Sequence, residues 1–258
     1  MPECCSGKEQ TGMKTLMTAG KGGTGKTALL AYGYRLGLLE ALPGRILLVD
    51  ADPHQAMGHL LGLDNALTLG DLRHRHRIGL KNGTGLEALS RRDFARQLAG
   101  EALQPLSPRV DGLLMGRNDD PGCQCVVNSL LGGALDALAE EYDWVLVDNE
   151  AGIEPIGRHR WPADILLLVV TPQPLDVWVG HRIMQQARDT GRQIRQPCTV
   201  LNRHRGGEAE DALPAPLLGR LPYSANLEAG GFPDIPWVAA LQEMWQRLRD
   251  EIGIAEGR

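Results

Sequence analysis

A glycine-rich stretch near the N-terminus reads Ala19-Gly20-Lys21-Gly22-Gly23-Thr24-Gly25-Lys26-Thr27. It satisfies the phosphate-loop pattern G-x-x-x-x-G-K-[ST] and carries a second lysine directly after the first glycine. An apolar run precedes it, and a helix-favouring stretch over 28–42 follows, so it has the strand–loop–helix context that the motif needs. Glycines let backbone N–H groups approach phosphate oxygens, and the helix N-terminus adds a positive dipole. The stretch therefore predicts a nucleotide-binding loop.

Within this loop, Lys26 is expected to reach the β- and γ-phosphates, and the Thr27 hydroxyl is expected to bind Mg²⁺. No Asn-Lys-x-Asp motif for reading guanine is present, which favours ATP over GTP. The predicted ATP-binding residues of the loop are Gly20, Lys21, Gly22, Gly23, Thr24, Gly25, Lys26 and Thr27.

Length, composition and charge limit the size of the fold and the kinds of partner that the protein can bind. A chain of 258 residues can form one large α/β domain, and 43% hydrophobic residues with only two Phe indicate a core of aliphatic side chains. The net charge of −5 argues against non-specific binding to nucleic acid or to an anionic membrane, so we expect neither as a partner. The first residues lack the apolar segment of a signal peptide, which favours a cytoplasmic location.

The chain alternates between short apolar runs and helix-favouring stretches. The runs are continuous, as expected for parallel strands covered on both faces, so the pattern predicts a doubly wound, mostly parallel α/β sheet flanked by helices. We expect residues 1–12 to be a disordered extension and 13–258 to form a single domain. The strands are predicted at 15–19, 45–50, 112–115, 144–148, 165–171, 198–201 and 217–221. The helices are predicted at 25–41, 92–99, 126–141, 177–190 and 236–252, and 202–216 is predicted as a surface loop.

Acidic residues end two of these strands. Asp50 and Asp52 follow the second strand, and Asp148 follows the fourth, where ligands bind in parallel sheets. A single aspartate at such a place is as often a helix cap as a metal ligand. Two such strands in a protein with a phosphate loop favour metal and water chemistry, with Asp148 as the carboxylate near Mg²⁺.

Together, the two-lysine loop, Asp50-Ala51-Asp52-Pro53 and Val147-Asp148 resemble the deviant-Walker P-loop ATPases. This family includes partition ATPases, septum-site ATPases, nitrogenase iron protein and metal-insertion accessory proteins. The resemblance implies a Mg²⁺-dependent ATPase with ATP held between two subunits of a homodimer. It makes Lys21, Lys26 and Asp52 catalytic: Lys21 reaches the phosphates of the partner subunit and Asp52 positions the attacking water. It also implies that Asn202 contacts adenine, that Pro222 belongs to the second base-side segment, and that 13–258 is one P-loop ATPase domain.

A pair of cysteines gives the second informative motif. Cys123 and Cys125 follow a Pro-Gly turn and precede a predicted helix, whose N-terminus favours the metal-binding thiolate. Two thiolates do not complete a tetrahedral site, but a two-fold dimer would supply four. A bare C-x-C is equally compatible with buried structural cysteines.

The residues around the pair resemble the accessory ATPases that insert nickel into carbon monoxide dehydrogenase. The similar segments are 116–131 and the second-switch stretch from Asp148 to Arg158. The resemblance implies that Cys123 and Cys125 bind Ni²⁺ or Zn²⁺ at a dimer interface. Pro155 departs from the family pattern, as do His54 and the Arg/His-rich stretch 73–77, which leaves the client enzyme open. Cys4 and Cys5 are expected to be idle, and 73–77 a solvated face.

The leading hypothesis is an ATP-dependent metallochaperone, whose dimerisation and hydrolysis are coupled to delivery of nickel to an apo carbon monoxide dehydrogenase-like enzyme. One alternative is a partition- or positioning-type ATPase switch, which would require a basic surface. The other is an electron-transfer iron protein, in which the shared cysteines would hold an iron–sulfur cluster.

Overall fold

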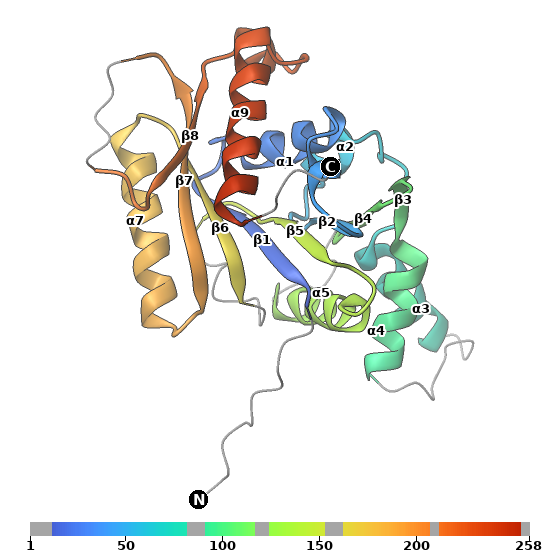
Figure 1. The fold of residues 1–258 in the computed structure, drawn as a ribbon. Helices are drawn as coiled ribbons and strands as arrows, with labels where there is room; N and C mark the ends of the chain where they lie inside the picture. Colours follow the sequence, from blue (N-terminus) through green and yellow to red (C-terminus); the bar gives the residue numbers. More distant parts are fainter. Residues whose placement is uncertain (1–11, 82–90, 117–123, 153–161, 207–211, 254–258) are drawn as a thin grey trace, which may run out of the picture.

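The computed structural model describes residues 12–81, 91–116, 124–152, 162–206 and 212–253. Within them the chain forms an eight-stranded sheet in the order β3-β4-β2-β5-β1-β6-β7-β8 (Figure 1). Every neighbouring pair is parallel except β3 and β4. The strands are β1 (Lys14–Ala19), β2 (Ile46–Asp50), β3 (Gln104–Ser107), β4 (Val110–Leu114), β5 (Trp144–Asp148), β6 (Ala163–Val170), β7 (Ile194–His204) and β8 (Leu217–Pro222).

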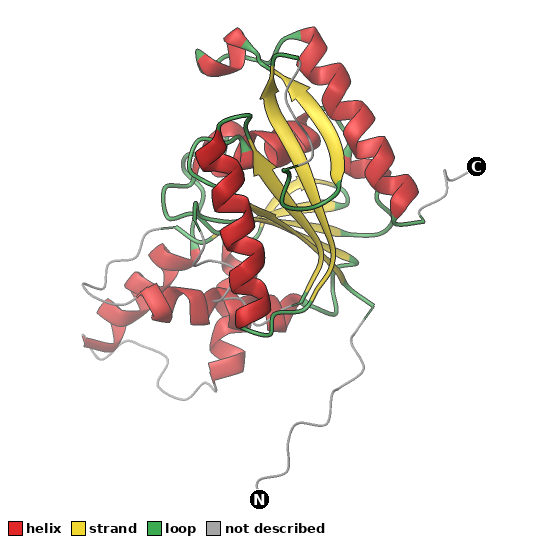
Figure 2. Cartoon of the chain, turned by 90° about the vertical axis from the view of Figure 1, so that its left-hand side faces the viewer, coloured by secondary structure: helices red, strands yellow, loops and turns green. Residues whose placement is uncertain are grey.

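Helices cover both faces of this sheet (Figure 2). On one face lie α1 (Lys26–Arg35), α2 (Ala56–Leu60) and α9 (Ile235–Glu251). On the other lie α3 (Leu69–Lys81), α4 (Arg91–Ala102), α5 (Gln124–Leu138) and α7 (Pro174–Asp189). The short α8 (Ala225–Glu228) precedes α9. The predicted doubly wound fold is thereby confirmed.

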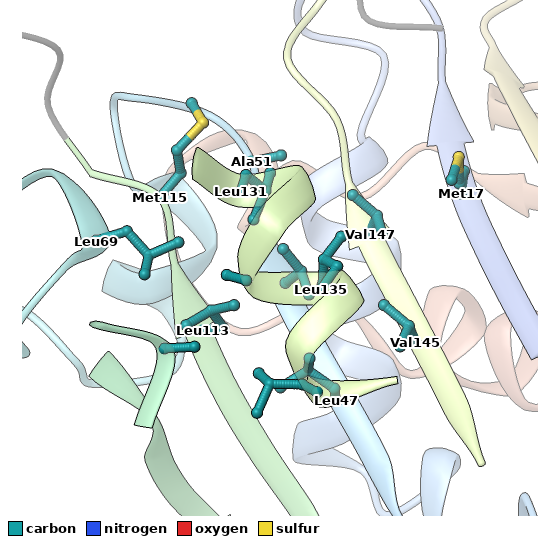
Figure 3. Close-up of a cluster of buried hydrophobic side chains, with 14 of the residues drawn as sticks. Met17, Leu47, Ala51, Leu69, Leu113, Met115, Leu131, Leu135, Val145 and Val147 are labelled. Atoms are coloured by element: carbon teal, nitrogen blue, oxygen red, sulfur yellow. The ribbon is translucent and has the colours of Figure 1, made fainter. Parts of the chain in front are cut away.

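The apolar runs pack on both faces because successive side chains of a strand point in opposite directions. In β2, Leu47 and Val49 belong to the core under α5, and Ile46 and Leu48 belong to the core under α1 and α9. Figure 3 shows the first of these cores, with Leu131 and Leu135 of α5 among side chains of the sheet. A continuous apolar run is therefore what this sheet requires of its central strands.

The structure differs from the sequence-based predictions at three places. The stretch 73–77, expected as a solvated face, lies inside the helix α3, which was not predicted and which buries Leu69 and Leu72 while its arginines stay outside the core. The four-residue edge strand β3 was not predicted, since Gln104–Ser107 carries no apolar run. Strand β7 continues to His204, so Asn202 lies within a strand and not after it. The expected extension over 1–12 falls outside the described residues, apart from its last residue.

None of the helices in the described ranges is both long enough and apolar enough to cross a membrane.

Strand β8 and helix α9 approach each other closely at a glycine. A Cβ atom built on Gly219 would lie 2.8 Å from Cγ and 2.9 Å from Cβ of Met244. These atoms are near the α9 backbone, so the clash cannot be relieved by moving the end of a flexible side chain.

We therefore predict that Gly219→Ala lowers the free energy of unfolding by about 1–3 kcal/mol, measured by urea denaturation. The matched control is Gly100→Ala in α4, where a new Cβ meets no atom within 4 Å. That control should raise stability by up to about 1 kcal/mol, because alanine is the better helix former. Equal effects of the two substitutions would contradict the proposed packing of α9 on β8.

Candidate functional site

The phosphate loop runs from the end of β1 to the start of α1, and two of its glycines are required by close contacts. Gly20 has φ 149°, and a Cβ there would lie 2.3 Å from the carbonyl oxygen of Val169. Gly25 has φ 102°, and its Cβ would lie 2.2 Å from Nδ2 of Asn202. The loop therefore tolerates no side chain at either position. Gly22 and Gly23 are exposed, which leaves the outer side of the loop open to a ligand.

Lys26 lies where the motif predicts, at the start of α1. Its ammonium donates to the carbonyl oxygens of Gly20 and Lys21, each at 3.2 Å, and the residue is buried. Burial lowers the pKa of Lys26, and the negative charges of Asp148 and Asp52 oppose this effect. A buried cation inside a glycine loop fits a phosphate group as its ligand.

Asp148 ends β5 beside the loop. Its carboxylate accepts hydrogen bonds from the hydroxyl groups of Thr18, at 3.0 Å, and of Thr27. Burial raises its pKa to about 6, although these two hydrogen bonds and the charge of Lys26 act in the opposite direction. A desolvated carboxylate next to a hydroxyl group is an oxygen donor set that suits Mg²⁺, so Thr27 and Asp148 fit the predicted metal site.

Asp50 and Asp52 shape the segment that follows β2. Asp50 is the register partner of Asp148, and its carboxylate accepts from the backbone N–H groups of Asp52 and Gly58, both at 3.0 Å. Burial raises the pKa of Asp50 to about 7. Asp52 is more open, with 24% of its side chain exposed, and accepts from the backbone N–H of His54 at 2.9 Å. The His54 ring contacts the same carboxylate oxygen at 2.8 Å.

Asn202 of β7 connects the phosphate loop to helix α9. Its amide donates to the carbonyl oxygen of Thr24 at 2.8 Å, and its own oxygen accepts from the Trp237 indole at 3.3 Å. Its role toward adenine remains a prediction, because its polar groups here hold the loop against α9. Pro222 ends β8, in register with His204 of β7.

Lys21, the second lysine of the loop, contacts its own chain. Its ammonium lies 2.9 Å from Oδ1 of Asp176 in the first turn of α7. Asp176 was not among the residues predicted from the sequence. Its place just after strand β6 could have assigned it to this edge of the sheet, but nothing in the spacing indicates the pair.

The segment after β5 is attached to the loop by its backbone. The Gly152 N–H donates to the carbonyl oxygen of Gly20 at 3.1 Å, and the Asn149 side chain donates to the carbonyl oxygen of Thr18 at 2.8 Å. This is the beginning of the predicted second switch, whose continuation over 153–161 lies outside the described residues.

The cysteine motif is described only in part. Cys125 lies in the first turn of α5, which confirms a helix start at this place, while its side chain and the whole of Cys123 lie outside the described parts. Among the residues that the structure describes, no three His, Cys, Asp or Glu side chains gather in a group that could hold a metal ion. Cys198 is buried in β7, and burial raises its pKa to about 11, as befits a core thiol.

The raised pKa of Asp50 predicts a pH dependence of stability. Between pH 4 and 7, roughly, the folded chain keeps a proton that the unfolded chain has released. In urea denaturation without nucleotide or Mg²⁺, the free energy of unfolding should therefore fall with rising pH by about 1.4 kcal/mol per pH unit for this proton. The fall should be shallower in Asp50→Asn. Parallel curves for the two proteins over this range would contradict the assignment.

The chain is similar in sequence to known ATP-binding proteins. It is 28% identical over 231 residues to an uncharacterized ATP-binding protein of Methanocaldococcus jannaschii, covering 86% of this chain and 89% of that protein. It is 30% identical over 240 residues to the carbon monoxide dehydrogenase accessory protein CooC of Rhodospirillum rubrum, covering 84% and 86% of the two chains. It is also 30% identical over 228 residues to a putative septum site-determining protein MinD of Guillardia theta, covering 80% and 74%. No protein-family model matches the chain.

Solved structures agree on the fold. MinD in the MinC:MinD complex of Aquifex aeolicus superposes with a TM-score of 0.65 at 21% identity, covering 95% of this chain and 98% of that one. MinD of Pyrococcus horikoshii, determined with Mg-ADP, gives 0.62 at 18% identity, covering 94% and 98%. With the loop geometry and the two relatives at 30% identity, these likenesses are sufficient: the chain belongs to the family of P-loop ATPases that includes MinD and CooC.

Proposed function

We propose that this protein is an ATP-dependent metallochaperone that carries nickel in a homodimer and delivers it to an apo carbon monoxide dehydrogenase or a related nickel enzyme. The observation that carries the proposal is a complete phosphate loop in one chain with a Cys-x-Cys pair whose second cysteine lies in the first turn of α5. The similarity to CooC over 86% of that protein supports the same reading.

Hydrolysis of ATP needs its phosphates held and neutralised and a water molecule aligned with the γ-phosphate. Lys26 is buried at the loop and supplies positive charge to the phosphates. Asp52, the most open of the three carboxylates, orients the attacking water. Mg²⁺, held by Thr27 and Asp148, would neutralise charge that develops on the phosphate oxygens. Lys21 acts on the phosphates bound to the partner subunit.

The second-switch segment, Asp148 to Arg158, is the proposed link between the nucleotide and the cysteines. It contacts the phosphate loop through the hydrogen bond from the Gly152 N–H to the carbonyl oxygen of Gly20. Two copies brought together around ATP would bring two Cys123–Cys125 pairs to one axis, and four thiolates suit the tetrahedral geometry of Zn²⁺ or bind Ni²⁺. Hydrolysis would loosen the dimer and release the metal.

Two substitutions should separate nucleotide binding from hydrolysis. Lys26→Ala should weaken ATP binding on the order of a hundredfold, because it removes charge-assisted hydrogen bonds to phosphate. Asp52→Ala should keep ATP binding and lower the hydrolysis rate by about a hundredfold or more. Calorimetry and phosphate release measure the two quantities. Asp64→Asn is the control, since Asp64 is exposed and paired with His59. Unchanged hydrolysis in Asp52→Ala would remove Asp52 from the mechanism.

If Cys123 and Cys125 bind the metal, their removal should affect metal binding and leave nucleotide binding intact. The double substitution of Cys123 and Cys125 by Ala should abolish nickel binding and metal-dependent dimerisation while ATP binding persists. Cys198→Ala is the control, because this thiol is buried in β7 and should not contribute a ligand. Nickel content by elemental analysis decides the point: normal stoichiometry in the double variant refutes the assignment. Iron in protein purified without oxygen would instead favour the iron–sulfur alternative.

A partition- or positioning-type switch is supported to the same degree by the MinD relatives. Helix α3 adds an observation in its favour, because Arg73 and Arg77 lie one turn apart on the same side of it. Binding of duplex DNA, measured over a range of salt concentrations, tests this reading, since phosphate contacts produce a steep salt dependence. Weak binding that is unaffected by Arg77→Glu would speak against it.

A further inference from the structure

The contact between Lys21 and Asp176 joins the signature lysine to a deeply buried carboxylate. The Asp176 side chain is 5% exposed, and its two oxygens have different partners. Oδ1 is 2.9 Å from the Lys21 ammonium, and Oδ2 accepts a hydrogen bond from the Thr171 hydroxyl at 2.5 Å. Lys21 keeps 38% of its side chain exposed. The carboxylate is thus fixed by the core, and the lysine is the partner that is free to leave.

Moving Lys21 away from Asp176 would cost free energy. Within the described ranges, Asp176 would then keep the Thr171 hydroxyl and the N-terminus of α7 as polar partners, and a buried carboxylate without its cation is strongly disfavoured. An ammonium group on Asp176 of its own chain cannot at the same time reach a phosphate on a second chain. Binding across an interface therefore competes with this pair.

Two large apolar side chains are exposed near the start of α7. Leu175 precedes Asp176, and Trp178 follows it by two residues; both side chains are 55% exposed. Arg182, one turn further along α7, lies over the Trp178 ring with 5.9 Å between guanidinium carbon and ring centroid. Large exposed apolar side chains on the helix that carries Asp176 are the kind of surface that a second subunit covers.

We propose that Asp176 is a positioning residue for Lys21: it holds the lysine on its own chain in the absence of nucleotide, and ATP together with a second copy of the chain must remove the lysine from it. The Lys21–Asp176 pair thus weakens dimerisation, because the two side chains must be separated before the dimer forms. This inference rests on the ATP-dependent homodimer of the proposed function and not on its metal.

The test is the dissociation constant of the dimer, measured by sedimentation with a non-hydrolysable ATP analogue and Mg²⁺, without nickel. Asp176→Asn keeps the size of the side chain and an oxygen for Thr171 while removing the charge that holds Lys21. We expect the dimer of this variant to be about tenfold tighter than that of the natural chain. Asp189→Asn is the matched control, since Asp189 is an exposed aspartate at the other end of α7, hydrogen-bonded to Gln185. It should leave the constant unchanged.

Two further measurements keep the inference open to refutation. Acetylation of lysine amines, followed residue by residue by mass spectrometry without nucleotide, should become faster at Lys21 in Asp176→Asn and stay the same at Lys14. In a Lys21→Ala background, Asp176→Asn should no longer tighten the dimer. A tighter dimer cannot result from a damaged fold, so a merely structural role for Asp176 would not produce it.

The outcomes are distinct. An unchanged or weaker dimer in Asp176→Asn, with the natural chain dimerising normally, overturns the role of Asp176 and leaves the proposed function standing. A natural chain that stays monomeric with the ATP analogue contradicts the proposed dimer and this inference together.

Discussion

The site depends on the close contact of the phosphate loop with strands β6 and β7. Gly20 lies against the carbonyl oxygen of Val169, and Gly25 lies against the Asn202 amide, both closer than any side chain would permit. Because these neighbours belong to strands of a parallel sheet, the position of the loop is fixed by the core. This fixed position brings the Lys26 ammonium, the Thr27 hydroxyl and the Asp148 carboxylate to one site.

Three ionisable groups are buried close together at the site. Asp50 and Asp148 are both desolvated, with pKa values raised to about 7 and about 6, and Lys26 has a lowered pKa. Such values are typical of sites built for a charged ligand, since a metal ion and phosphates supply the missing charges. The charge of Lys21 is also paired within the single chain, because its ammonium contacts the Asp176 carboxylate.

Much of this arrangement could be predicted from the sequence, for identifiable reasons. The loop motif and the strand-end aspartates are local signals, and the parallel sheet brings them to one edge whatever the details of packing. The pairing of Lys21 with Asp176 joins residues far apart in the sequence, and no spacing rule predicts it. Helix α3 was missed because its arginines and histidines mask the two buried leucines at helical spacing. The use of Asn202 to hold the loop against Trp237 likewise depends on tertiary contacts.

The central claim is that one assembly, an ATP-bound dimer, is what carries the metal. Native mass spectrometry of the natural chain with Ni²⁺, with and without an ATP analogue and Mg²⁺, measures subunit number and metal content in the same particle. We expect nickel on the dimer, with one ion shared by two chains, and we expect ATP to increase the amount of this species. Nickel held by single chains, or a dimer that forms with ATP and never contains nickel, would contradict it.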